Sequence, residues 1–156
     1  MPVRNLAIVL GDQLDSESAV FDDFDADRDV VWMAEVAEEA TYVPAHRRRL
    51  VLFFAAMRHF RDSLRREGIR VQYQALSMDA ACDRGTDFAE VLREDVPALQ
   101  PATMVVVEPG DWRVREALRR CADELRVPLE IRRDRHFYCG IDEFRDWARQ
   151  RRSLLL

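Results

Sequence analysis

Short apolar runs alternate with helical patterns along most of the chain, and this alternation restricts the fold more than any other feature. The helical patterns cover residues 50–64, 87–99, 111–125 and 142–152. Strands separated by helices form βαβ units, in which right-handed crossovers place helices on both faces of a mainly parallel sheet. The short segments that predict the strands lie at residues 5–10, 29–34, 69–76, 104–107 and 129–132.

The third predicted strand indicates the order of the sheet. Residues 69–76 alternate between apolar and polar side chains, as a strand exposed on one face does. With this strand at an edge, the sequence predicts an α/β fold: a Rossmann-like three-layer domain with a five-stranded parallel sheet of order 3-2-1-4-5. Ligands bind such sheets outside the carboxyl ends of the strands, where the strand order reverses. Three loops are therefore expected to meet there: residues 11–14, 35–42 and 108–113.

The longest helix pattern follows an acidic, aromatic stretch that we expect to be a loop. Apolar residues recur at steps of three and four from Leu50 to Leu64, which predicts one apolar stripe. Residues 50–57 are apolar all round, so we expect the sheet to cover one side and a partner to cover the other. Pro44 is expected in the first helical turn, and Gly68 is placed to end the helix.

Length, charge and cysteine content restrict the class of protein. The chain has 156 residues, enough for one ordinary core, and we expect one domain. It contains no lysine, and its net charge of -5 disfavours general nucleic-acid binding. The three cysteines, Cys82, Cys121 and Cys139, are scattered and predict reduced thiols in a cytoplasmic protein. No segment predicts a signal peptide or a membrane span.

The three loops favour a ligand rich in hydrogen-bond donors over a phosphate. The GDQL motif at residues 11–14 has one glycine followed by an acid, unlike a dinucleotide or Walker loop. Several acids repel a bare phosphate and accept hydrogen bonds from hydroxyl or N–H groups, while aromatic side chains can flank a planar ring. The acids are Asp12, Glu35, Glu38, Glu39 and Glu108, and the aromatic residues are Tyr42, Phe53 and Trp112.

An alternative remains open for each acid, because acids also cap helices or pair with nearby arginines such as Arg47, Arg48, Arg113 and Arg115. His46 and His59 have no carboxylate at metal-ligand spacing, and we predict no metal site. No serine lies in a nucleophile elbow and no cysteine has an evident base, so no catalytic residue is predicted in this chain.

Five motifs are spread along nearly the whole chain. They are AIVLGDQL at residues 7–14, the acidic stretch at residues 35–42, HRRRLVLFFAAMRHF at residues 46–60, VEPGDWRVR at residues 107–115 and FRDWARQRRSL at residues 144–154. Together these motifs resemble the photolyase-related family, which comprises iron–sulfur bacterial cryptochromes and prokaryotic (6-4) photolyases.

The resemblance implies a light-harvesting function for residues 1–156. In the family, this N-terminal domain binds the antenna chromophore 6,7-dimethyl-8-ribityllumazine, which passes excitation to a flavin. The family often has a histidine just before the position of His46, where this chain has Ala45, so one ring contact differs here. The cofactor-binding residues implied by the resemblance are Gly11, Asp12, Gln13, Glu35, Glu39, Tyr42, His46 and Phe53.

The resemblance also implies that the chain is an N-terminal fragment. FAD, a 4Fe-4S cluster, the catalytic residues and the DNA-binding surface would then lie in a C-terminal helical domain, which would be this domain's partner. Light-driven DNA photolyase activity would belong to the full-length protein. Two alternatives stay open: a nucleotide hydrolase or transferase in which Asp12 and Glu35 hold Mg²⁺, and a non-catalytic interaction module that uses residues 47–49 and the apolar helix.

Overall fold

A parallel sheet forms the centre of the computed structural model, which describes residues 2–77, 79, 83–149 and 151. Within these residues the sheet has five strands in the order β3-β2-β1-β4-β5, and every neighbouring pair is parallel. The predicted fold class, strand order and edge strand are therefore confirmed. The strands are β1 (Asn5–Ile8), β2 (Val30–Ala34), β3 (Val71–Gln74), β4 (Thr103–Val107) and β5 (Leu129–Arg132).

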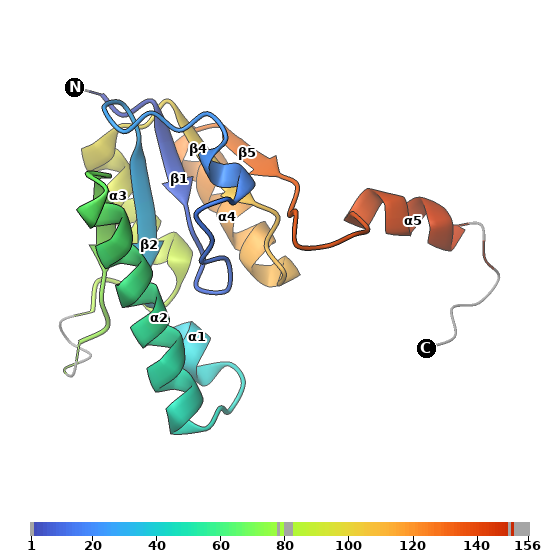
Figure 1. The fold of residues 1–156 in the computed structure, drawn as a ribbon, viewed down its shortest axis with the longest axis horizontal. Helices are drawn as coiled ribbons and strands as arrows, with labels where there is room; N and C mark the ends of the chain where they lie inside the picture. Colours follow the sequence, from blue (N-terminus) through green and yellow to red (C-terminus); the bar gives the residue numbers. More distant parts are fainter. Residues whose placement is uncertain (1, 78, 80–82, 150, 152–156) are drawn as a thin grey trace.

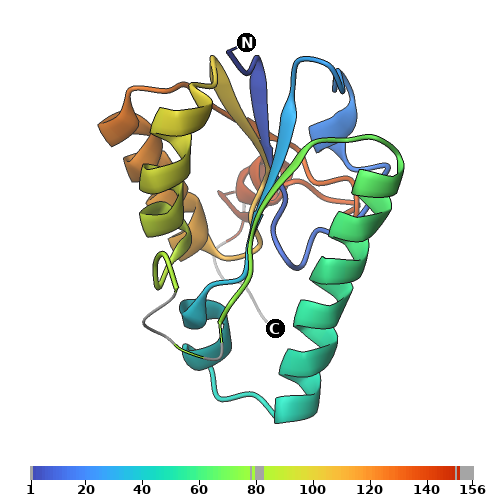
Figure 2. The same cartoon turned by 90° about the vertical axis from the view of Figure 1, so that its left-hand side faces the viewer.

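Helices cover both faces of the sheet, which gives the three predicted layers. Helices α3 and α4 lie on one face, and α2 lies on the other beside the short 3-10 helix η1 (Figure 2). The short helix α1 lies at the carboxyl end of the strands, and α5 extends away from the sheet (Figure 1). The bounds are η1 Ala19–Phe21, α1 Ala37–Thr41, α2 Arg47–Arg66, α3 Phe88–Leu99, α4 Trp112–Leu125 and α5 Ile141–Arg149.

The core has two parts because side chains of the central strands alternate between the faces. Leu6 and Trp32 point toward α3 and α4, whereas Ala7 and Met33 point toward α2, and all four are at most 1% exposed. Burying one large apolar side chain stabilises the fold by about 1.5–3 kcal/mol. The sheet is thus a rigid platform whose carboxyl edge can carry a site.

Two local predictions are wrong. The acidic stretch at residues 35–42 is not a plain loop, because it contains α1. Pro44 lies outside α2, whose N-cap is His46: the His46 Nδ1 atom accepts a hydrogen bond of 3.2 Å from the Arg48 amide. Gly68 adopts a φ of +82° just beyond α2, as its predicted role at the helix end requires.

The outer side of α2 is open to solvent. Val51 and Leu52 are 68% and 71% exposed, whereas Met57 on the inner side is 1% exposed. No helix among the described residues is long and apolar enough to cross a membrane. Cys121 and Cys139 are free thiols, and Cys82 lies outside the described residues.

Candidate ligand-binding site

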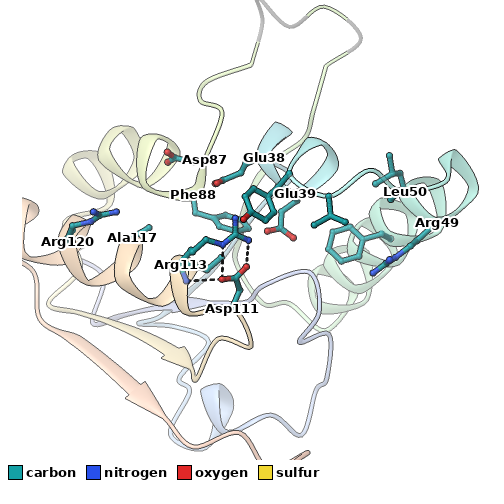
Figure 3. A pocket seen from close by; sticks show the side chains of 15 residues that line it. Glu38, Glu39, Arg49, Leu50, Asp87, Phe88, Asp111, Arg113, Ala117 and Arg120 are labelled. Carbon is teal, nitrogen blue, oxygen red and sulfur yellow. Dashed lines mark hydrogen bonds and ion pairs between the residues drawn. The ribbon is translucent and has the colours of Figure 1, made fainter. Parts of the chain in front are cut away.

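A cavity of about 600 Å³ lies at the carboxyl end of the sheet, where the sequence predicted a crevice. Its lining comes from α1 and the connection to α2, the start of α2, the start of α3, and α4 as far as Arg120 (Figure 3). This volume lies within the range of about 300–1,000 Å³ that is typical of small-molecule sites. Three of the cofactor-binding residues implied by the resemblance line the cavity: Glu39, Tyr42 and Phe53.

One wall is built by Tyr42, Arg113 and Asp111. The Arg113 guanidinium carbon lies 3.2 Å from the centroid of the Tyr42 ring, a cation–π contact between α4 and α1. Asp111 holds this guanidinium by two hydrogen bonds, one of which, from Nε to Oδ1, is 3.1 Å long. Asp111 also caps α4, as predicted, because its Oδ1 atom accepts a 2.8 Å bond from the Arg113 amide. The aromatic ring of Tyr42 is thereby tied to the start of α4.

The opposite wall is apolar and depends on Gly11. Phe53 projects from α2 into the cavity lining and packs over this glycine. A Cβ atom on Gly11 would lie 2.9 Å from both Phe53 Cε1 and Met57 Sδ, with Phe53 Cζ nearer still. Gly11 therefore supports the site by allowing α2 to approach the end of β1.

Glu39 is the acid best placed to meet a ligand. It lines the cavity, and no hydrogen bond or ion pair joins its carboxylate to any described residue. Desolvation and the like charges of Asp12, Glu38 and Asp111 raise the pKa of Glu39, and Arg113 opposes this shift. Glu38, another acid of the predicted crevice, lines the same cavity.

Asp12 lies beside the cavity, and its charge influences the electrostatic potential there. Desolvation raises the pKa of Asp12, and the charges of Asp134 and Asp111 act in the same direction. The loops after β1 and β4 therefore meet at the carboxyl edge with the acidic segment that follows β2, as the topology predicted.

Glu35 is directed away from the cavity and into an ion-pair network. Its two oxygens accept 2.7 Å bonds from Arg58, and they also accept bonds from the Tyr73 hydroxyl and the Leu76 amide. Desolvation acts to raise the pKa of Glu35, but these donors outweigh it and the pKa lies below its ordinary value. Because both oxygens are engaged, the magnesium pair of Asp12 and Glu35 is not formed.

Gln13 and His46 also lie outside the lining of the cavity. Gln13 is buried, and its side-chain amide donates to the carbonyl groups of Val107 and Glu108 at 3.4 and 3.0 Å. It therefore joins the loop after β1 to the end of β4. His46 caps α2, and its neighbour Ala45 lines the cavity instead.

The remaining candidates from the sequence have other surroundings. Trp112 is 69% exposed and does not line the cavity. Glu108 forms a 2.9 Å ion pair with Arg115, as the alternative of arginine pairing predicted. Within the described residues, no group of three or more His, Cys, Asp or Glu side chains is arranged to hold a metal ion.

Sequence reasoning missed the contribution of α3. Asp87 and Phe88 line the cavity, and Asp87 caps α3 by accepting a 2.8 Å bond from the Glu90 amide. The switch-point argument selected the loops after the first, second and fourth strands and did not include the loop after the third. The signal that could have found it is the Asp-Phe pair that opens a helix after a parallel strand.

The fold and the cavity together define a class of protein. It is a doubly wound α/β domain with a cavity of small-molecule size beyond the carboxyl ends of its strands. Residues 7–156 match the family described as deoxyribodipyrimidine photo-lyase-related protein, and the chain belongs to that family. It is 40% identical over 154 residues to a (6-4) photolyase of Agrobacterium fabrum (strain C58). That alignment covers 99% of this chain and 30% of the relative's length. The resemblance found from the motifs is confirmed at the level of the family.

Proposed function

We propose that this chain is the antenna-binding domain of a photolyase-like flavoprotein and that its cavity binds 6,7-dimethyl-8-ribityllumazine. When bound, such a chromophore absorbs light and passes the excitation to a flavin. Membership of the photolyase-related family and the similarity to a (6-4) photolyase support this proposal.

The residues of the cavity fit the two halves of this ligand. Phe53 and Phe88 offer apolar surface to a methylated planar ring, and Tyr42 offers an aromatic face backed by Arg113. The ring also carries carbonyl groups, which need N–H donors. Arg49 lines the cavity and forms no ion pair with a described residue, so its guanidinium is free to donate.

The observation that carries the proposal is the unpaired carboxylate of Glu39 in this aromatic cavity. An ionised carboxylate accepts hydrogen bonds only, so it suits the ribityl hydroxyls or a ring N–H group. Because desolvation and neighbouring acids raise the pKa of Glu39, its charge costs folding free energy when no ligand is present. A donor-rich ligand offsets that cost.

Fluorescence titration of wild type, Glu39→Gln and Glu17→Gln with ribityllumazine tests the role of Glu39. Losing a hydrogen bond to a charged group costs about 1.5–3 kcal/mol, so Glu39→Gln should weaken binding by roughly ten- to a hundredfold. Its melting temperature should stay the same or rise, because a repelled charge is removed. Glu17 is exposed and lies outside the cavity lining, and its variant should bind like wild type.

Two outcomes would contradict the proposal. Equal affinities of wild type and Glu39→Gln would remove this residue from the site. An absence of ribityllumazine binding by the wild-type chain, together with an absorption spectrum of the full-length protein that lacks an antenna band, would reject the antenna function itself.

The proposal places the remaining photochemistry in the part of the protein that this chain does not span. There we expect FAD, a 4Fe-4S cluster and the surface that contacts the DNA lesion, so that repair needs the full-length protein. We further propose that this second part covers the outer side of α2, where Val51 and Leu52 are exposed. The competing magnesium-nucleotide function lacks support, because Glu35 is engaged by Arg58 and Tyr73.

A further inference from the structure

A buried carboxylate on α3 lies at the centre of a hydrogen-bond network. Asp95 is 4% exposed, and its Oδ2 atom accepts a 2.8 Å bond from the indole N–H of Trp32. Its Oδ1 atom accepts a 2.9 Å bond from the side-chain amide of Gln72. These bonds fix Asp95 between α3 and strands β2 and β3.

Arg84 completes this network from the connection between β3 and α3. Its two terminal nitrogens donate to both oxygens of Asp95 at 2.8 and 3.0 Å. Its Nε atom donates to the side-chain carbonyl of Gln74 at 2.7 Å. A two-pronged arginine–carboxylate contact fixes orientation as well as distance. Arg84 therefore holds the chain that follows it in one place on the sheet.

The segment at residues 84–87 contacts helix α3 closely. A Cβ atom on Gly85 would lie 2.8 Å from Glu90 Cβ and 3.1 Å from the Val91 amide nitrogen. Real side chains do not tolerate such distances, so only glycine allows this approach. Glu90 adds two bonds to Thr86, one to its amide at 2.7 Å and one to its hydroxyl at 2.9 Å.

This segment supplies the hydrogen-bond acceptor that α1 lacks at its N-terminus. The N-cap residue of α1 is Val36, which has no side-chain acceptor. Instead, the carbonyl of Thr86 accepts a 3.0 Å bond from the Glu38 amide in the first turn of α1. With five residues and none of them buried, α1 is too short to be stable by itself. Its position therefore depends on contacts at its two ends: Thr86 at the start, and the stack of Tyr42 on Arg113 at the end.

We propose that Arg84 is a positioning residue of the ligand cavity: by fixing Thr86, it places α1 and with it Glu38, Glu39 and Tyr42. This inference rests on the proposed function, because it assigns Arg84 an effect on ligand affinity. The path runs from buried Asp95 through Arg84 and the Thr86 carbonyl to the cavity wall. Arg84 does not line the cavity, so its effect is indirect.

Amide hydrogen exchange of the whole chain, measured by NMR, tests this support without any ligand. Arg84→Ala removes the contact with Asp95, and Gly85→Ala pushes the segment away from α3 without uncovering a buried charge. In both variants the Glu38 amide should exchange about tenfold faster, the effect of losing roughly 1.4 kcal/mol of local hydrogen bonding. Affinity for ribityllumazine should fall by a similar factor.

Arg4→Ala is the matched control. Arg4 also forms a two-pronged contact with a buried carboxylate, Asp29, but near the N-terminal end of the sheet. The control should speed exchange of core amides and leave the Glu38 amide and ligand affinity unchanged. Unchanged Glu38 exchange in both test variants, or equal acceleration in Arg4→Ala, would overturn the inference.

Binding and exchange separate the two proposals. If wild type binds no ribityllumazine but the Glu38 amide responds as expected, the proposed function fails and the support of α1 by Arg84 stands. If wild type binds and the test variants bind equally well, the positioning role fails and the proposed function stands. Should Arg84→Ala not fold, Gly85→Ala decides the question by the same two measurements.

Discussion

Gly11→Ala gives the most direct test of how α2 forms the apolar wall of the cavity. The added methyl group would meet Phe53 Cε1 and Met57 Sδ at 2.9 Å, whereas ordinary carbon contacts are about 3.5 Å. Phe53 must therefore retreat by at least about 0.6 Å, and Met57 is held in the core with 1% exposure. The displaced ring has to move toward the cavity, or α2 has to shift away from β1.

The structure indicates how Gly11→Ala should change the stability and the ligand affinity. Overpacking of this kind typically costs about 1–3 kcal/mol of unfolding free energy. For a domain of this length, that loss corresponds to a fall in melting temperature of roughly 2–12 °C. Ligand affinity should fall as well, because Phe53 lines the cavity. Adding Phe53→Leu should restore part of the stability, since a smaller side chain leaves room for the new methyl group.

Thermal melts and ribityllumazine titrations of four proteins make the test: wild type, Gly11→Ala, the double variant and Gly110→Ala. Gly110 is the matched control, because a Cβ atom there would meet only Asp12 Oδ2, at an ordinary 3.6 Å. Its substitution should be nearly neutral. Equal melting temperatures for wild type and Gly11→Ala, or strictly additive effects in the double variant, would refute the packing argument.

Three further predictions concern the Glu35 carboxylate, the outer side of α2 and the net charge of the chain. In the folded chain the pKa of Glu35 lies below its ordinary value of 4.5, so the stability it gives is complete above about pH 4.5 and is lost as pH falls through the folded pKa. Glu35→Gln should lower the unfolding free energy by about 3 kcal/mol at pH 7. It should also reduce the fall of melting temperature at acidic pH, and an unchanged fall would contradict this prediction. The isolated chain should self-associate and bind a hydrophobic dye through the outer side of α2, and Leu52→Glu should reduce both effects. Light scattering that finds a strict monomer at high concentration would count against the proposal that another part of the protein covers this side of α2. The net charge of -5 on the chain predicts weak, salt-sensitive DNA binding in a mobility-shift assay. Tight binding of DNA at high salt would disprove this prediction.

Periodicity predicted the architecture because the sheet is buried on both faces. Strand β2 is apolar throughout, and all five of its residues are buried. The polar alternation of residues 69–76 located the edge strand, since β3 is only partly buried. Boundaries were predicted less well, because a strand ends where its ladder of hydrogen bonds ends. β1 stops at Ile8 although Val9 and Leu10 are equally buried.

The site was less predictable because an acid's role depends on its partner in space. Glu35 and Glu39 stand four positions apart in one acidic stretch, yet Glu35 is hydrogen-bonded by Arg58 and Tyr73, while Glu39 lines the cavity beside several like charges and forms no hydrogen bond or ion pair with a described residue. Nothing local in the sequence distinguishes them. The same reason hid the role of Thr86, whose contribution is a backbone carbonyl that any residue type could offer.

The charges that line the cavity favour a neutral ligand with donors at one side and acceptors at the other. Asp87 and Asp111 are committed to helix caps, and Arg113 is committed to Asp111. Among the described lining residues, this leaves two acids on α1, Glu38 and Glu39, and two unpaired arginines, Arg49 on α2 and Arg120 on α4. A phosphate would pair with the arginines and be repelled by the glutamates. A pyrimidinedione ring with a polyhydroxyl chain satisfies both, because its carbonyls accept from arginine and its hydroxyls donate to glutamate.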